Sequence, residues 1–187
     1  FKAAGYQYSD DFTAMNDLKQ VPALGLFAEV GLPFALDENP TRLTQMTTKA
    51  LDLLDGQNDK GFFVMIEGSQ IDWCGHANDI ACAMGEMDDF AKSIEQAKAY
   101  VDKNPDTLLV ITADHSTGGL TLGAHGQYKW ETDVVKGVKA TAGTITKDLL
   151  ESDDLKAVWQ KYSDIEFTDA NSIKLSQAKK MGEKALL

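Results

Sequence analysis

Three short apolar segments interrupt an otherwise mixed sequence. They cover residues 23–27, 61–66 and 107–112. Apolar runs without alternation are typical of strands in a parallel sheet that is covered by helices on both faces. The pattern therefore predicts three buried parallel strands, and a further strand is expected at Lys2–Tyr8.

Apolar residues at helical spacing separate these strands. They predict one helix over about Arg42–Leu54 and a long amphipathic helix over about Asn78–Asp102. A short helix through about Leu18 is expected after Ser9-Asp10-Asp11, whose side chains could cap its start. Strand alternating with helix is typical of a doubly wound α/β fold, with a mainly parallel sheet and helices on both faces.

The pattern changes after Gly123. Four segments, polar on one side, are predicted to be helical: residues 132–138, 143–151, 154–162 and 168–187. We expect residues 1–187 to form a single, partial domain. Within it, residues 1–123 would hold the sheet and the candidate ligands, and residues 124–187 would be a mainly helical peripheral insertion.

The chain is acidic, with a formal net charge of −11. An acidic surface repels nucleic acid and anionic membranes, so neither is an expected partner. No apolar run reaches the roughly 18 residues that span a bilayer. Cys74 and Cys82 are eight residues apart, a spacing that fits no metal knuckle; they could form a bridge, but two buried thiols are the favoured prediction.

Polar clusters follow the second and third predicted strands. Ligands of doubly wound folds bind at the carboxyl ends of strands, so residues there are candidates for a site. Imidazole and carboxylate groups suit zinc, and carboxylates suit magnesium. The candidates are Glu67, Asp72, His76, Asp114 and His115.

The spacing within each cluster adds detail. Asp72 and His76 are four residues apart, so a helical turn would place them on one face, where one zinc ion could hold both. Asp114 and His115 are adjacent and would point in opposite directions in a strand. They can share a site only where the strand has given way to a loop, which Gly118-Gly119 suggests.

The segments around these residues resemble bacterial alkaline phosphatases. GFFVMIEGSQIDWCGHAND (61–79) is similar to the family's first metal-binding segment, and VITADHSTGGLTLG (110–123) is similar to its second. Two flanking stretches also resemble family sequence, and together the resemblance covers most of the chain. They are GLFAEVGLPFALD (25–37) and YKWETDVVKGVKAT (128–141).

The resemblance implies a role for each candidate. Glu67 would be the magnesium ligand, Asp72 and His76 would bind the first zinc, and Asp114 and His115 would bind the second. The implied activity is phosphomonoester hydrolysis through a phosphoserine intermediate. The parent enzyme would be a periplasmic or secreted homodimer.

Other elements of the family pattern are missing from the chain. It has no Asp-Ser-Ala for the nucleophile, no match for the aspartate that bridges zinc and magnesium, and no His-Thr-Gly for a further zinc ligand. Its one arginine, Arg42, lies in a setting unlike that of the phosphate-holding arginine. Both ends of the enzyme are therefore expected to be absent. Each zinc would have two ligands from this chain, so we expect no phosphatase activity from the chain alone.

The sequence leaves more than one interpretation open for some residues and for the function. Trp73 would line the substrate entrance or simply pack, and His125 is expected in a surface loop. A solvated helix face is predicted for the acidic residues Glu86, Asp88 and Asp89. Another superfamily member (a phosphodiesterase or a metal-dependent phosphoglycerate mutase) and a non-catalytic metal-binding domain are the alternative functions.

Overall fold

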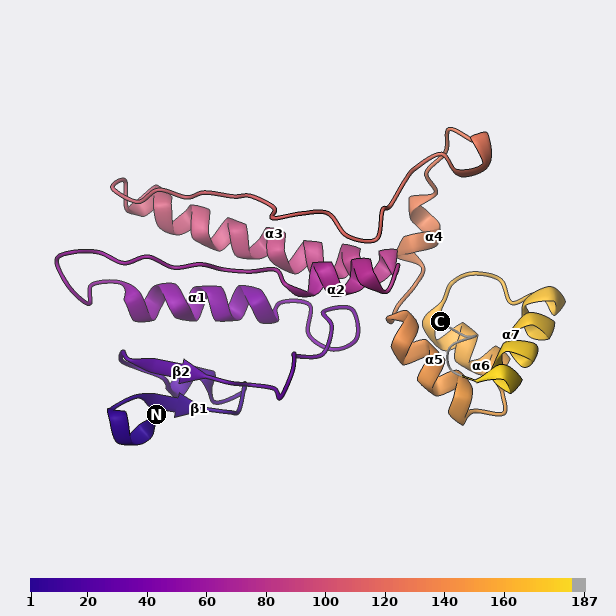
Figure 1. The fold of residues 1–187 in the computed structure, drawn as a ribbon, viewed down its shortest axis with the longest axis horizontal. Coiled ribbons are helices and arrows are strands. Elements are labelled where there is room, and N and C mark those ends of the chain that lie inside the picture. The colour runs from indigo at the N-terminus through magenta and orange to yellow at the C-terminus, as the bar shows by residue number, and fades with distance from the viewer. Residues whose placement is uncertain (183–187) are drawn as a thin grey trace. The chain divides into compact units, whose positions relative to one another are not determined.

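The computed structural model describes residues 1–182 (Figure 1). Residue contacts divide the chain into two compact units. The first contains residues 1–33, 40–68 and 87–112, and the second contains residues 34–39, 69–86 and those from 113 onward. Within the described part of the chain, no helix is long and apolar enough to cross a bilayer.

The first unit begins with a small parallel sheet. Strand β1 (Gln7–Ser9) pairs with β2 (Ala23–Gly25), with Gln7 opposite Ala23. The 3₁₀ turn η1 (Lys2–Ala4) replaces the start of the strand predicted at residues 2–8. The helix predicted through Leu18 is reduced to the 3₁₀ turn η2 (Met15–Asp17). The small sheet and the helices give the predicted α/β class.

Two helices form most of the first unit. Helix α1 (Arg42–Leu54) has the predicted bounds, and α3 (Ile80–Lys103) differs from its prediction by two residues at the start and one at the end. Asn78 adopts a left-handed backbone conformation with φ of 53°, which excludes it from the helix. Helix α3 continues across both units, because its residues up to Glu86 belong to the second.

The other two predicted strands, 61–66 and 107–112, are not strands in this structure. The only sheet within residues 1–182 is the β1–β2 pair, so neither segment takes part in a ladder. Residues 61–66 alternate between half-buried and exposed: Phe62 contacts the ring of Tyr100 on α3, whereas Phe63 is 89% exposed. A strand needs a hydrogen-bonded neighbour, and these segments have one half-buried face but no neighbouring strand among residues 1–182.

The second unit is helical. The elements after residue 123 agree with the predicted helical segments as far as Met181, and residues 183–187 of the last prediction lie outside the described part. The unit contains α2 (Gln70–His76), η3 (Ala124–Gly126), α4 (Thr132–Lys136), α5 (Ala142–Glu151), α6 (Leu155–Tyr162) and α7 (Asp169–Met181). Whether residue 123 divides the ligand core from a peripheral insertion stays a prediction.

Buried carboxylates join distant segments within each unit. The predicted solvated face is therefore wrong for Glu86 and Asp89, which are 6% and 0% exposed. In the second unit, Glu86 accepts a hydrogen bond from the amide of Ala35 (2.8 Å). In the first unit, Asp89 accepts hydrogen bonds from the amides at the start of α1. Asp88 is exposed as predicted and pairs with Lys92.

Candidate metal-ligand site

Helix α2 carries the first pair of candidate ligands. The seven-residue helix supplies the turn that the Asp-x-x-x-His spacing requires, and Asp72 and His76 lie on one face of it. His76 Nε2 is 3.5 Å from Asp72 Oδ2, and the His76 side chain is 73% exposed. Trp73, between them, is 40% exposed.

The second pair lies in the loop that follows residue 112. His115 Nε2 is 3.5 Å from Asp114 Oδ2, and the backbone N–H of His115 donates to Asp114 Oδ1 at 3.0 Å. This backbone hydrogen bond, together with the donation from its own backbone amide and the attraction of the His115 ring, lowers the pKa of Asp114. A loop rather than a strand at this point lets the two adjacent side chains converge.

Thr117 brings the two pairs together. Its Oγ1 donates to Asp72 Oδ1 at 2.6 Å and lies 3.1 Å from His115 Nδ1. The sequence analysis did not select Thr117. The sequence offered one signal for it: Thr117 carries a hydroxyl two residues after His115, a candidate ligand. A hydroxyl at that distance can hydrogen-bond the imidazole and orient it without binding the metal itself.

The donor atoms suit zinc in kind and in spacing. Zinc bonds oxygen and nitrogen at about 2.0–2.2 Å in tetrahedral sites, so two of its ligands lie roughly 3.3–3.5 Å apart. The oxygen and nitrogen of each candidate pair are 3.5 Å apart. In residues 1–182, however, no three His, Cys, Asp or Glu side chains gather around one point where a metal could bind. Each pair is therefore an incomplete ligand set.

The remaining candidates lie as follows. Glu67 is exposed at the end of residues 61–66, in the first unit, and its magnesium role stays a prediction. Arg42 is buried, with Nη1 3.7 Å from Asp89 Oδ2. Arg42 therefore forms an ion pair at the start of α1. This agrees with its sequence setting, which differs from that of the family's phosphate-holding arginine. His125 is exposed, with φ of 57°.

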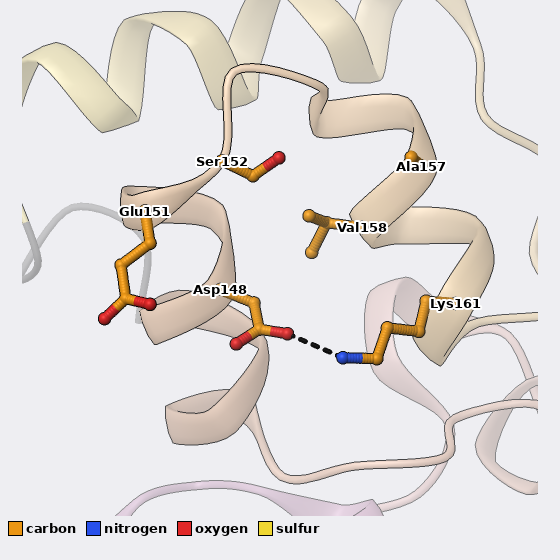
Figure 2. Close-up of a pocket in the computed structure, with 6 residues that line it drawn as sticks. All are labelled: Asp148, Glu151, Ser152, Ala157, Val158 and Lys161. Atoms are coloured by element: carbon orange, nitrogen blue, oxygen red, sulfur yellow. Dashed lines mark hydrogen bonds and ion pairs between the residues drawn. The ribbon is translucent and has the colours of Figure 1, made fainter.

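A shallow cavity lies between α5 and α6, with a volume of about 380 Å³ (Figure 2). It contains one ion pair, between Asp148 and Lys161 (2.9 Å), and none of the candidate ligands. The hydroxyl of Tyr162 donates to Asp148 at 2.6 Å. That hydrogen bond, with the one from Lys161, lowers the pKa of Asp148. Because these polar groups satisfy one another, we assign the cavity no chemistry.

Cys74 and Cys82 form a disulfide, so the favoured prediction of two free thiols is wrong. Both cysteines are buried as predicted, at 0% and 2% exposure. The bridge links α2 to the first turn of α3. The chain reverses between these helices through Asn78, which brings the two cysteines together, and spacing alone does not show that reversal.

Comparison with known proteins identifies the family to which the chain belongs. The family model for alkaline phosphatase matches residues 1–185, so the chain belongs to the alkaline phosphatase family of phosphomonoesterases. The match favours this family over the alternative functions expected from the sequence.

Individual relatives support this assignment. The chain is 40% identical to alkaline phosphatase 4 of Bacillus subtilis over 99% of its own length and 40% of the relative's. It is 34% identical to the alkaline phosphatase of Escherichia coli over 62% of its length and 30% of the relative's. Among solved structures, the cold-active alkaline phosphatase of a psychrophilic Shewanella superimposes with a TM-score of 0.93 at 43% identity, covering 99% of this chain and 46% of that one. The chain thus spans about 40% of the length of the first curated relative.

Proposed function

We propose that this chain supplies part of the metal site of a phosphomonoesterase. Asp72 and His76 would hold one zinc ion, Asp114 and His115 a second, and Glu67 a magnesium ion. One observation supports this proposal most directly. The Asp72–His76 pair and the Asp114–His115 pair each have an oxygen and a nitrogen 3.5 Å apart, and the hydroxyl of Thr117 contacts both pairs. The sequence resemblance supports the magnesium role of Glu67.

Bound metal ions would neutralise the charge that develops on the attacking and leaving oxygens of a phosphoryl group. The residues of this chain would do the orienting. Helix α2 and the 113–117 loop hold the carboxylates and imidazoles, and Trp73, which lies between Asp72 and His76 in the sequence, would line the substrate entrance. Positive metal charge would also offset the acidic protein surface for an anionic phosphomonoester.

The nucleophilic serine of the phosphoserine mechanism is not among the residues of this chain that match the family motifs. We therefore propose that the 187-residue chain alone is inactive and that the parent enzyme, a homodimer, carries the activity. Two ligands per zinc, against the three or four usual in zinc sites, support this proposal.

Exposed apolar segments also support a larger parent fold. Phe63, Met65, Leu108 and Val110 are 72–89% exposed, on two segments without ladder partners in the described residues. Uncovered apolar faces and strand edges promote association. We expect the isolated chain to self-associate in size-exclusion chromatography, and elution as a clean monomer would contradict this.

We propose a periplasmic or secreted location for the parent enzyme. The Cys74–Cys82 disulfide supports this, because such bonds persist in oxidising compartments. The net charge of −11 supports the expectation that neither nucleic acid nor an anionic membrane is a partner.

Zinc titration of the chain tests the metal site, with competition against a chelator to determine affinity. We expect His76→Ala and His115→Ala to weaken zinc binding at least tenfold, whereas His125→Ala, which changes the third histidine, leaves it unchanged. Equal zinc binding by all four proteins, or none by the wild type, would refute the site. Turnover of p-nitrophenyl phosphate by the pure chain would refute the proposed inactivity.

A further inference from the structure

Thr117 lies where the two candidate ligand segments meet. Its single hydroxyl is 2.6 Å from Asp72 Oδ1 and 3.1 Å from His115 Nδ1, so it contacts one candidate ligand from each segment. The side chain is half-buried, whereas His115 and Asp114 are 60% and 84% exposed. Thr117 is thus less exposed than the two candidate ligands of its own loop.

Two glycines allow this loop to approach α2. A Cβ on Gly118 would lie 2.4 Å from the carbonyl oxygen of Gly75, and a Cβ on Gly75 would lie 3.0 Å from the carbonyl oxygen of Thr117. Gly118 also has φ of +82°, a conformation that side chains disfavour. The close approach of the two backbones places the Thr117 hydroxyl within hydrogen-bonding distance of Asp72.

Counting protons determines the direction of both hydrogen bonds. An ionised carboxylate can only accept, so the one hydroxyl proton of Thr117 goes to Asp72. The contact with His115 then requires Nδ1–H to donate to Thr117 Oγ1. A neutral imidazole carries one N–H, so Nε2 keeps its lone pair. Nε2 is also the nitrogen that lies 3.5 Å from Asp114 Oδ2.

We infer that Thr117 is a positioning residue for the metal site. It orients Asp72 and holds neutral His115 as the Nδ1–H tautomer, so that Nε2 and the free Asp72 oxygen are ready to bind zinc before the metal arrives. This inference rests on the proposed function. Its tautomer part can be tested without metal, because it concerns the protein's own protons.

The test compares Thr117→Val, which removes the hydroxyl at similar volume, with Thr117→Ser, which keeps it. The first measurement is ¹⁵N NMR of the histidine rings in the metal-free chain, at a pH where they are neutral. We expect His115 to be the Nδ1–H tautomer in the wild type and in Thr117→Ser, and to gain Nε2–H population in Thr117→Val. An Nε2–H wild type, or an unchanged tautomer in Thr117→Val, would overturn the inference.

A second variant perturbs the same two hydrogen bonds from the Asp72 side. In Asp72→Ala the Thr117 hydroxyl loses its acceptor and becomes free to donate to His115 Nδ1, so the Nε2–H population should rise. No rise would overturn the proton arrangement. This variant keeps the test decisive if Thr117→Val fails to fold.

Zinc affinity is the second measurement. Partners that hold a metal ligand from behind typically change affinity by about 10–100-fold when they are removed. We expect that loss in Thr117→Val and affinity near the wild type in Thr117→Ser; equal affinity in all three would overturn the positioning role. If the wild type binds no zinc, the metal-site proposal fails, and the ring spectra still decide whether Thr117 sets the tautomer.

Discussion

The start of helix α1 depends on a single buried carboxylate, that of Asp89 on α3. Its Oδ2 accepts from the amide of Leu43 (2.9 Å), and its Oδ1 accepts from the amide (3.0 Å) and hydroxyl (2.7 Å) of Thr44. Arg42 Nη1 lies 3.7 Å from Oδ2, and both side chains are buried. The negative charge also lies at the positive end of the helix dipole.

Asp89→Ala would remove a buried ion-pair partner of Arg42 and the acceptor of two amides at a helix start. Breaking a buried ion pair from one side costs about 3–5 kcal/mol, a large part of the roughly 5–15 kcal/mol that stabilises a typical protein. Asp89→Asn keeps one oxygen acceptor and loses the charge. Since hydrogen bonds to charged groups contribute about 1.5–3 kcal/mol, we expect this variant to lose about 2 kcal/mol.

Urea unfolding followed by circular dichroism measures these losses. With a slope of about 2 kcal/mol per molar urea, Asp89→Ala should lower the midpoint by roughly 1.5–2.5 M, and Asp89→Asn by about 1 M. The matched control is Asp88→Ala, one residue earlier on the same helix. Its exposed ion pair with Lys92 contributes only about 0.3–0.5 kcal/mol.

Equal midpoint shifts in Asp88→Ala and Asp89→Ala would refute this reasoning. A loss of less than about 1 kcal/mol in Asp89→Ala would refute it as well, because a desolvated carboxylate with three donors cannot be that dispensable. Either result would mean that α1 begins without help from α3.

Three further changes test other parts of the structure. Gly118→Ala should destabilise the chain by more than about 1 kcal/mol in urea unfolding, because its Cβ would meet a carbonyl oxygen at 2.4 Å in a left-handed conformation; an unchanged midpoint would contradict the close approach to α2. Replacing Cys74 and Cys82 together by alanine should cost about 2.5 kcal/mol, from the chain entropy of a loop with a separation of eight residues; equal urea midpoints would contradict this. The pKa of Asp148 is lowered, chiefly by the hydrogen bond from Tyr162, so its stabilisation is present above the ordinary value of 3.8 and lost as pH falls through the folded-state pKa. The stability difference between the wild type and Asp148→Asn should therefore shrink below about pH 4, and a difference independent of pH would contradict the shift.

Helices were the part of the fold that the sequence predicted best. The bounds of α1 agree with the prediction, because amphipathic spacing is a local property of the chain. Pairing into a sheet is not local. Residues 61–66 and 107–112 have the apolar character of strands, but a ladder also needs a neighbour, and none of the described residues provides one.

In the candidate site, too, local features were predicted and contacts between distant segments were not. Motif spacing and resemblance selected Asp72, His76, Asp114 and His115, and the structure brings each pair to 3.5 Å. The link through Thr117 was not predicted, because it depends on a close backbone approach between segments whose linked residues, Asp72 and Thr117, are 45 residues apart in sequence. The disulfide escaped it for a similar reason, since it depends on the chain reversal between α2 and α3.

The most buried face of helix α3 is largely polar, although the helix itself was predicted from its apolar spacing. Its most buried side chains form a stripe at intervals of four, three and four residues, and three of the four are polar: Cys82, Glu86, Asp89 and Ser93 are 0–6% exposed. Met84 and Met87, two apolar residues of the same helix, are 45% and 44% exposed. A polar stripe is buried here because its carboxylates bind backbone amides of other segments, an interaction that hydrophobicity does not register. Met84, Met87, Phe63 and Leu108 are large apolar side chains that stay exposed within residues 1–182, so hydrophobicity alone does not predict which residues of this chain are buried.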